Sequence, residues 1–282
     1  MYDAQVILDS TTPNGDRLTT FEITYPRFVH AEFMTHKVFG RNSSSSRAIP
    51  NERLIQKLKD DPVLPVWWGK NQRGMQARQE IEDIEGAKEW WLRGRDMMIE
   101  WAEEGAAKFD LHKQIANRPL EAWMWITVIV TSTQYGNFFA LRCHPDAQPE
   151  IQKIAYMMED LYKTSLPHLL GWGKWHLPYI REEEWSQHSI DELIKLSVAR
   201  CARVSYLTHD GIMDLEKDLG LFALLSDGGH WSPFEHQAKV ERATYPPNEV
   251  IKSSSMSGNL RSINWTQLRK TFEGENREWT PR

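Results

Sequence analysis

The hydrophobic positions near the N-terminus follow the spacing of β-strands. Apolar residues cluster or alternate in Val6–Leu8 and Thr20–Tyr25, and Pro13-Asn14-Gly15 between them is a turn signal. The pattern predicts a β-hairpin. Pro26 suits the first position of a helix, and the apolar stripe after it predicts a helix that ends near Phe39.

The next hundred residues carry patterns that favour helices. We expect a short helix at Asn51–Asp60, a loop at Trp67–Gly74 and a long helix from Gln76 to about Lys108, where good helix formers recur without proline. A further apolar helix is expected from Arg118-Pro119 through Val130. The middle of the chain is therefore predicted to be helical.

The last two predicted helices rest on capping patterns. Asp146 is a candidate cap for a helix over Ala147–Leu166, and Ser189 with Glu192 forms a capping-box pattern ahead of Ile190–Ala202. The elements together predict an α+β fold, mainly helical, with strands near both ends of the chain. We find no internal repeat, so residues 1–282 are expected to form a single domain.

Length and composition narrow the class of protein. The 282 residues are 40% apolar and 26% charged, and no segment is apolar for the eighteen or so residues that a membrane span needs. The first ten residues lack the basic and apolar regions of a secretion signal. We therefore expect a cytoplasmic protein without a membrane partner.

Charge and cysteine count narrow the chemistry. A formal charge of −5 gives no global attraction to a nucleic acid polymer, so an anionic ligand must be held by a local arginine cluster. Cys143 and Cys201 are the only cysteines, which rules out a disulfide framework and any site built on several thiolates. No metal site is expected, because His230, Glu235 and His236 do not have the spacing of a metal-binding motif.

Three segments carry candidate chemistry. Thr35–Arg47 (THKVFGRNSSSSR) combines cations, hydroxyls and an amide that suit a nucleotide, although a solvated polar loop is an equal alternative. Arg142 follows an apolar run that would fix the direction of its guanidinium; a salt bridge to Asp146 or Glu150 is the alternative. Arg118 invites the same two interpretations. The third segment comprises residues 199–206 and 229–238.

Taken together, these segments resemble the flavin-dependent thymidylate synthases. The family's four motifs have counterparts in ARVSY at 202–206, GHWSPFEH at 229–236, TFEITYPRFVHAEFMTHKVFGRNSSSSRA at 20–48, and NFFALR with AQPEI at 137–151. The family's first two motifs come last here, as in a circular permutation. The four matches cover about a fifth of the chain.

The resemblance implies a set of site residues. Ser45, Arg47, Arg118 and Arg142 fall where family members bind and activate the nucleotide, with Ser45, Arg47 and Arg142 as the catalytic set. Positions that contact FAD in the family correspond to a larger group: Thr35, His36, Lys37, Asn42, Asn137, Ser205, His236 and, in a second possible match, Asn259 and Arg261. Thr131 and Thr133 replace an Asn-x-Arg flavin contact at its usual place.

Several residues depart from the family pattern. Thr35 and Lys37 replace the outer arginines of Arg-His-Arg, and Gly40 replaces a serine. Glu32 stands where a glutamine is usual in the nucleotide site, which exchanges an amide for an acceptor-only carboxylate. These changes leave the identity of the base open between uracil and cytosine.

The resemblance also implies an activity. It is FAD-dependent one-carbon transfer and reduction at C5 of dUMP to give dTMP, with methylenetetrahydrofolate and NADPH as co-substrates, in a homotetramer whose active sites combine residues from several subunits. Three alternatives stay open. They are cysteine-dependent transfer through Cys143, a flavin-dependent methyl- or hydroxymethyltransferase acting on dCMP or dUMP, and a non-catalytic flavin or nucleotide sensor.

Overall fold

A five-stranded sheet forms the centre of the molecule. The computed structural model describes residues 1–206, 214–242, 260–273 and 275. Its strands lie in the order β3-β4-β2-β1-β5, and all neighbours are antiparallel except β1 and β5. The strands are β1 (Asp3–Thr11), β2 (Arg17–Pro26), β3 (Gly40–Ser43), β4 (Trp125–Ser132) and β5 (His168–Leu169).

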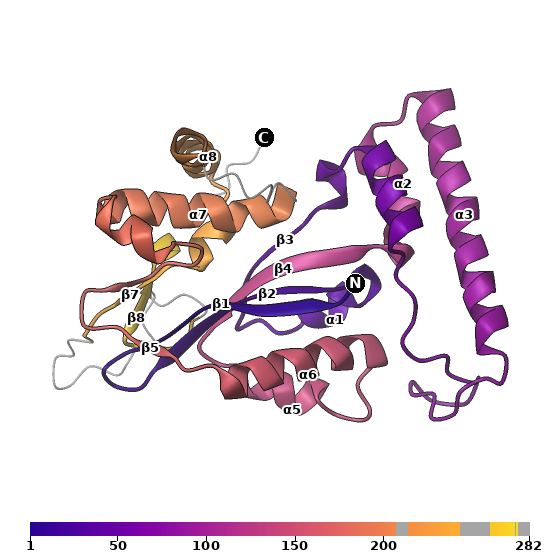
Figure 1. The fold of residues 1–282 in the computed structure, drawn as a ribbon, viewed down its shortest axis with the longest axis horizontal. Helices are drawn as coiled ribbons and strands as arrows, with labels where there is room; N and C mark the ends of the chain where they lie inside the picture. Colours follow the sequence, from indigo (N-terminus) through magenta and orange to yellow (C-terminus); the bar gives the residue numbers. More distant parts are fainter. Residues whose placement is uncertain (207–213, 243–259, 274, 276–282) are drawn as a thin grey trace, which may run out of the picture.

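Helices cover both faces of this sheet. On the first face lie α1, α5 and α6; on the second lie α7 and α8 (Figure 1). A long helix, α3, stands at the end of the sheet beside α2. The helices are α1 (His30–Met34), α2 (Asn51–Asp60), α3 (Ile84–Phe109), α4 (Lys113–Ala116), α5 (Gly136–Arg142), α6 (Pro149–Thr164), α7 (Ile190–Tyr206) and α8 (Leu215–Gly228).

Smaller elements complete the second face and the connections. A three-stranded sheet joins β6 (Trp175–His176), β7 (Ala238–Val240) and β8 (Trp265–Gln267). The 3-10 helices are η1 (Arg27–Val29), η2 (Ser46–Ala48), η3 (Arg118–Trp123), η4 (Glu182–Ser186), η5 (Ser232–Glu235) and η7 (Leu268–Thr271). The α+β fold class predicted from the sequence is confirmed.

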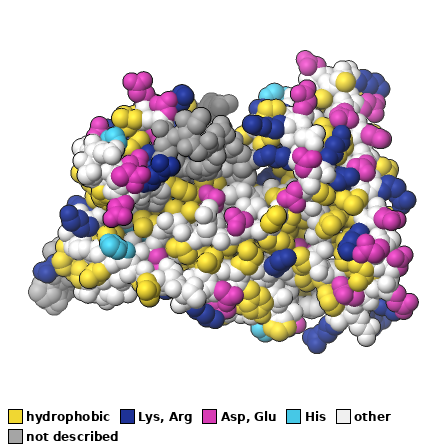
Figure 2. All heavy atoms as spheres, viewed as in Figure 1, with side chains coloured by type: hydrophobic (Ala, Val, Ile, Leu, Met, Phe, Trp, Pro, Cys, Tyr) yellow, Lys and Arg dark blue, Asp and Glu magenta, His cyan; other side chains and the backbone are white. Residues whose placement is uncertain are grey.

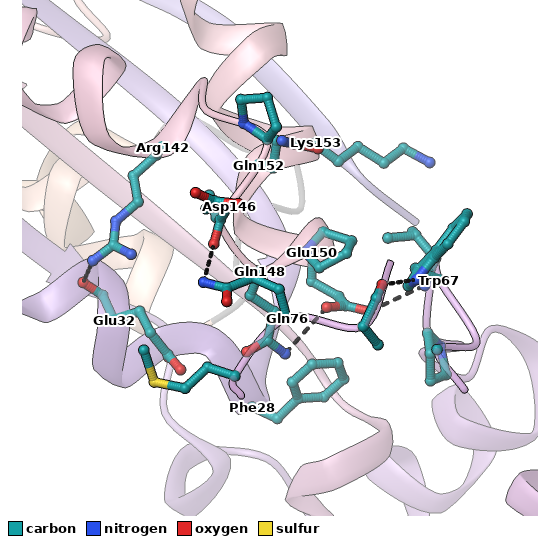
Figure 3. Close-up of a pocket in the computed structure, with 18 of the residues that line it drawn as sticks. Phe28, Glu32, Trp67, Gln76, Arg142, Asp146, Gln148, Glu150, Gln152 and Lys153 are labelled. Atoms are coloured by element: carbon teal, nitrogen blue, oxygen red, sulfur yellow. Dashed lines mark hydrogen bonds between the residues drawn. The ribbon is translucent and has the colours of Figure 1, made fainter. Parts of the chain in front are cut away.

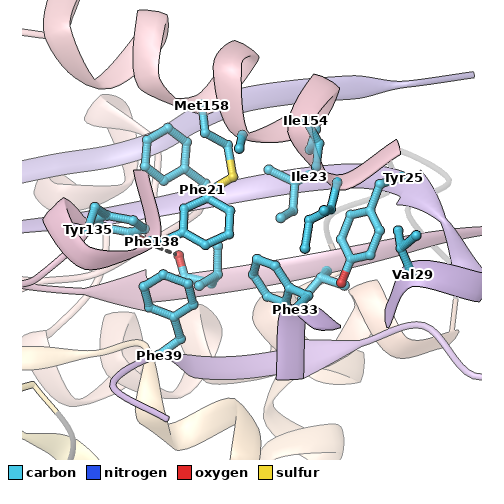
Figure 4. Close-up of a cluster of buried hydrophobic side chains, with 14 of the residues drawn as sticks. Phe21, Ile23, Tyr25, Val29, Phe33, Phe39, Tyr135, Phe138, Ile154 and Met158 are labelled. Carbon is cyan, nitrogen blue, oxygen red and sulfur yellow. Dashed lines mark hydrogen bonds between the residues drawn. The ribbon is translucent and has the colours of Figure 1, made fainter. Parts of the chain in front are cut away.

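The alternation of residues in β2 assigns each side chain to one face. Phe21, Ile23 and Tyr25 point to the first face, where they join the aromatic side chains of α1 and α5 in the largest hydrophobic core (Figure 4). Thr20 and Thr24 point to the second face. The first face is therefore packed with apolar rings, whereas the second also holds polar groups.

Four predicted elements agree with the structure. The hairpin of β1 and β2 is present, and Gly15 in its turn has φ 86°, which glycine adopts without steric cost. The helix at Asn51–Asp60 and the loop at Trp67–Gly74 are confirmed. The capping box of α7 is formed, because Ser189 N donates to Glu192 Oε2 at 2.9 Å and Glu192 N donates to Ser189 Oγ at 3.3 Å.

The predicted apolar helix from Arg118 through Val130 is wrong in its second half: residues 118–123 form the 3-10 helix η3, but the chain from Trp125 onward is β4. The strand is an interior strand of the sheet with both faces covered, so its apolar residues run on without alternation and resemble a buried helix. Its β-branched sequence, ITVIVT, favours the strand, and that signal outweighs the run of apolar residues.

Other boundaries also differ from the prediction. The long helix begins at Ile84 rather than Gln76, because Asp83 Oδ1 accepts a hydrogen bond from Gly86 N at 2.9 Å and caps it. The helix after Pro26 ends at Met34, not near Phe39. Asp146 is not a cap, since α6 begins at Pro149, whose fixed φ suits a first helical position.

The surface seen in Figure 2 mixes both signs of charge over α2 and α3, with apolar side chains exposed among them. None of the helices in the described part of the chain has the length and apolar character that crossing a membrane requires.

Candidate active site

Arg142, the last residue of α5, is held in one orientation by neutral groups. Its Nε donates to His36 Nε2 at 3.1 Å, and its Nη2 donates to Thr35 Oγ1 at 3.3 Å. Nη2 also donates to the Glu32 backbone oxygen at 3.4 Å (Figure 3). Within the described part of the chain, no carboxylate lies within ion-pair distance of this guanidinium. Its positive charge is thus oriented but not neutralised.

His36 can accept this hydrogen bond because it is uncharged. Only 6% of the residue is exposed, and its ring packs on Phe39 and Phe138. Burial, followed by the charges of Arg142 and Arg41, lowers its pKa to about 4. At neutral pH, His36 therefore presents a lone pair to Arg142.

A pocket of about 1250 Å³ opens beside Arg142; we call it the Arg142 pocket. It lies between α1, the start of α6 and the loop that precedes α3. Its lining includes Phe28, Glu32, Trp67, Gln76, Arg78, Trp91, Arg142, Gln148, Lys153 and Tyr156. Glu32 Oε2 is buried and has no hydrogen-bond partner among the described residues. The pocket thus offers flat aromatic walls and cationic side chains, and one lining carboxylate has an oxygen without a donor.

The alternative salt bridge for Arg142 does not form. Asp146 pairs with Arg78 at 3.5 Å, and Glu150 accepts hydrogen bonds from Val66 N and Gln148 Nε2, both at 3.1 Å. These bonds attach the loop before α3 to the start of α6. The acidic residues nearest in sequence thus build the pocket wall and leave Arg142 available.

The other half of the Thr35–Arg47 segment lies on the second face of the sheet. Asn42, Ser45 and Arg47 line a smaller pocket of about 450 Å³, which we call the Arg47 pocket. Ser45 Oγ accepts from Arg47 N at 3.3 Å, and Asn42 Nδ2 donates to the Cys201 backbone oxygen at 2.9 Å. The two pockets share no lining residue.

Arg118 lies on η3, near the Arg47 pocket but outside its lining. Its Nη1 forms an ion pair with Glu121 Oε1 at 2.9 Å, and the same carboxylate oxygen accepts from Ser46 Oγ at 2.9 Å. The salt bridge considered as the alternative for Arg118 is therefore present. Half of the Arg118 side chain stays exposed.

His236 lies deep on the second face. It follows η5, is 0% exposed, and its Nδ1 is hydrogen-bonded to Thr131 Oγ1 at 2.9 Å. Within the described part of the chain, its Nε2 is buried and unpaired, as is Thr133 Oγ1, and neither residue lines the Arg142 or the Arg47 pocket. Leaving such groups unpaired is costly, so each suits an added hydrogen-bonding partner.

The remaining predicted residues line neither pocket. Lys37 and Asn137 are exposed, as is Thr35 beside Arg142, and Arg261 is exposed with φ 57° ahead of β8. Ser205 belongs to the last turn of α7, but its side chain, like the whole of Asn259, lies outside the described residues.

The cysteine alternative has little support in this geometry. Burial and the nearby Glu159 raise the pKa of Cys143 to about 11, whereas an activated nucleophile needs a lowered pKa. Within the described ranges, no group of three or more His, Cys, Asp or Glu side chains is placed to hold a metal ion.

Sequence reasoning missed most of the Arg142 pocket lining. Trp67, Gln76 and Arg78 come from a loop without periodicity, and nothing in their spacing indicates that the loop reaches α6. It also missed His176, which is buried beside Thr20. Such contacts depend on strand register and loop path, which sequence spacing does not encode.

Fold and site together define an α+β protein in which an oriented arginine, without an ion-pair partner among the described residues, lines a pocket of about 1250 Å³. The sequence profile of the family described as Thy1, thymidylate synthase complementing protein, matches residues 17–168. This is more than half of the chain, so the chain belongs to that family. It is an enzyme of the flavin-dependent thymidylate synthase type.

Solved structures provide a second comparison. The flavin-dependent thymidylate synthase ThyX from Helicobacter pylori, complexed with FAD and dUMP, is 17% identical with a TM-score of 0.35, covering 51% of this chain and 67% of that one. The UMP/dUMP methylase PolB from Streptomyces cacaoi, bound with 5-Br UMP, is 15% identical with a TM-score of 0.43, covering 57% and 88%. No curated protein matches the chain.

Proposed function

We propose that this enzyme transfers a one-carbon unit to C5 of dUMP and reduces it to the methyl group of dTMP. Methylenetetrahydrofolate would donate the carbon, NADPH the reducing equivalents, and FAD would be the cofactor. The observation that carries the proposal is Arg142, whose guanidinium is oriented by neutral acceptors and faces the larger pocket. An arginine held in this way is suited to a phosphate or a pyrimidine carbonyl.

The chain's residues would divide the work of binding and activation. Arg142 would hold and polarise the nucleotide, while His36 and Thr35 fix the direction of its guanidinium. The aromatic walls of the pocket would align a flat ring and exclude water from it. Bound FAD would supply the electrons for reduction of the transferred carbon.

The second set of nucleotide residues supports a shared site. Ser45 and Arg47 line a pocket against α7 on the second face of the sheet, whereas Arg142 ends α5 on the first face. One nucleotide could contact both sets only if a second copy of the chain brought its Arg47 pocket to the Arg142 pocket. We therefore propose a homotetramer whose sites combine subunits, with Arg118 beside the Arg47 set.

The flavin would lie where the Arg142 pocket of one copy meets the Arg47 pocket of another. The unpaired Nε2 of His236 and Oγ1 of Thr133 fit a ligand rich in hydrogen-bonding groups. The exposed side chains of Thr35, Lys37 and Asn137 are available for the polar parts of the flavin, and Asn42 lines the Arg47 pocket. Ser205, Asn259 and Arg261 stay in this proposal on the resemblance alone.

The test is turnover by the purified protein with FAD, NADPH, methylenetetrahydrofolate and dUMP, followed by the mass of the nucleotide product. We expect the visible absorption of bound flavin and a product heavier by one methylene unit. Protein that binds FAD but neither oxidises NADPH nor changes the nucleotide would instead support the non-catalytic sensor. Protein that cannot be loaded with FAD would overturn the proposal.

A second candidate, methyl or hydroxymethyl transfer to dCMP, is favoured by one observation. The buried Glu32 Oε2 has no donor, and a cytosine amino group is a donor where uracil presents a carbonyl. If Glu32 reads the base, Glu32→Gln should shift the dUMP-to-dCMP ratio of kcat/KM toward dUMP by about tenfold, the effect of one hydrogen bond to a charged group. An unchanged ratio would rule out this candidate. The control is Glu150→Gln, the same change at another carboxylate that lines the pocket.

A further inference from the structure

Five buried polar side chains form one continuous line of hydrogen bonds across the second face of the sheet. Ser10 Oγ is bonded to His176 Nδ1 at 2.8 Å, and His176 Nε2 to Thr20 Oγ1 at 2.9 Å. Thr20 Oγ1 is bonded to Thr131 Oγ1 at 2.7 Å, and Thr131 Oγ1 to His236 Nδ1 at 2.9 Å. None of the five is more than 1% exposed. We call this line the Ser10–His236 relay.

Strand register builds the relay. Thr20 and Thr131 are directly opposite partners on β2 and β4, and Gly40 of β3 is the next partner of Thr131. A Cβ on Gly40 would lie 3.2 Å from both Cβ and the backbone oxygen of Glu235. Glycine therefore lets η5 approach the sheet closely and places His236 over Thr131.

Each hydroxyl in the relay has one proton, so all its hydrogen bonds must point in the same direction. In one direction, Ser10 donates to His176, and successive donations end on His236 Nδ1. The proton of His236 is then on Nε2. In the other direction, His236 Nδ1 donates first, and the last donation, from His176, ends on Ser10.

The two directions differ in their unpaired groups. Among the described residues, Ser10 Oγ has no hydrogen-bond partner other than His176. The direction that ends on Ser10 would leave its buried O–H proton without an acceptor, as well as leaving His236 Nε2 without a donor. The direction that begins at Ser10 leaves only the N–H of His236 unpaired. It costs one buried unpaired group fewer, so it is favoured.

We infer that the Ser10–His236 relay fixes the tautomer of His236, so that its Nε2–H donates a hydrogen bond to an acceptor atom of the bound flavin. Thr131, Thr20, His176 and Ser10 are then positioning residues that act through His236. The inference rests on the proposed function for the identity of the ligand, whereas the direction of the relay rests on the chain alone.

Both imidazoles are neutral near pH 7, as a tautomer-based device requires. Burial lowers the pKa of His176 and of His236 to about 3 each; nearby Asp9 slightly opposes this for His176, and His176 itself adds to it for His236. Neutral imidazole has one donor and one acceptor nitrogen, so the partner of one nitrogen decides the role of the other.

The direct test reads the protonated nitrogen. Magic-angle-spinning NMR of sedimented protein containing 15N-labelled histidine distinguishes the two tautomers, and the His236→Asn spectrum identifies the His236 signals. We expect the proton on Nε2 in the wild type and in Thr131→Ser, which keeps the hydroxyl. Thr131→Val should give a mixture. A wild-type proton on Nδ1 would overturn the inference, whether or not the protein binds FAD.

The functional test measures the dissociation constant of FAD. Thr131→Val and Thr20→Val should each weaken FAD binding about three- to tenfold, the range for one neutral hydrogen bond. The matched controls are Thr127→Val and Thr24→Val. They remove a second cross-strand hydroxyl pair, at 2.9 Å on the same two strands, which has no hydrogen bond to a histidine in the described part of the chain.

The outcomes separate the two proposals. If the wild type binds FAD and the relay variants bind it no more weakly than their controls, the inference fails and the proposed function stands. If the wild type does not bind FAD, the proposed function fails, and the NMR result still decides the direction of the relay. Thr131→Ser, expected to bind FAD within twofold of the wild type, guards against a loss caused by misfolding.

Discussion

Two buried or half-buried arginines of this molecule have opposite surroundings. Arg200 in α7 is 4% exposed and bonds to carboxylates, with Nη1 at 2.7 Å from Glu184 Oε2 and Nε at 3.3 Å from Asp218 Oδ2. Among the described residues, Arg142 bonds only to an imidazole nitrogen, a hydroxyl and a backbone oxygen. Both are fixed in direction, but only Arg142 keeps an unneutralised charge.

The difference separates a structural arginine from one that awaits a ligand. The Arg200 cluster consists of Arg200 and Arg203 of α7, Glu184 of η4 and Asp218 of α8. Arg200 pairs with both carboxylates, and Asp218 also pairs with Arg203 at 2.6 Å, so the cluster joins α7 to η4 and α8. Its charges neutralise one another inside the protein. The charge of Arg142 is instead available to an anionic ligand in the Arg142 pocket. Disrupting the Arg200 cluster should therefore lower stability, whereas replacing Arg142 should weaken binding.

The largest effect is expected in the paired region. Asp218 is 1% exposed, and Asp218→Ala would leave Arg203 and part of Arg200 without a countercharge. We expect a loss of about 3–5 kcal/mol in the free energy of unfolding, measured by urea denaturation. Glu104→Ala, which breaks an exposed ion pair with Lys108, is the control and should change little. A similarly small change in the free energy of unfolding for Asp218→Ala would contradict the structural role assigned to the Arg200 cluster.

A smaller effect, on binding instead of stability, is expected at Arg142. Arg142→Ala should leave the urea midpoint nearly unchanged and weaken dUMP binding by roughly 100-fold, or about 2–3 kcal/mol, because charge-assisted hydrogen bonds to the anion are lost. Calorimetric titration of FAD-loaded protein measures this. Arg142→Lys should recover only part of the affinity, since a lysine lacks the planar fork. Loss of stability without loss of affinity would reverse the two roles.

Acid should affect the two regions in sequence, with the smallest change of the three. The pKa of His36 is lowered from 6.5 to about 4, so as the pH falls the unfolded state takes up a proton before the folded state does. The stability contributed by neutral His36 is therefore complete above pH 6.5 and is lost as the pH falls toward 4. Hydrogen bonds from Arg200 lower the pKa of Glu184 below 4.5, so its contribution is present above 4.5 and lost only at lower pH.

Hydrogen exchange measured by mass spectrometry tests this order. After correction for the intrinsic pH dependence of exchange, peptides from residues 30–43 should lose protection between pH 6.5 and 4, before peptides from residues 184–203 do. His36→Asn should flatten the first transition and leave the second in place. Simultaneous loss in both regions would mean that the two arginines share one cooperative unit.

Local sequence signals predicted the elements whose stability is local. The hairpin turn at Pro13–Gly15 and the capping box of Ser189 and Glu192 act within a few residues, so the pattern alone located them. The assignment of β4 failed because a central strand, covered on both faces, has no alternation. Similarly, the motif segments by themselves indicated the family, but they did not indicate which residues share a pocket.

The sequence of the segment Thr35–Arg47 indicated its chemistry but not which of its residues share a pocket. Its composition indicated a polar ligand, and its motif, taken with the three other segments, indicated the family. Only the tertiary structure shows that β3 carries the chain from one face of the sheet to the other, so that His36 serves the Arg142 pocket and Arg47 lines a separate one.

The sequence by itself therefore determined the family, the hairpin and the main helices, because those depend on residue type and short-range spacing. The tertiary structure decided that Arg142 bonds to neutral groups, with no countercharge among the residues that the structure describes, and that Thr20 meets Thr131 in the Ser10–His236 relay. Both outcomes depend on contacts between residues more than a hundred positions apart, which strand register and helix packing fix and local patterns do not encode.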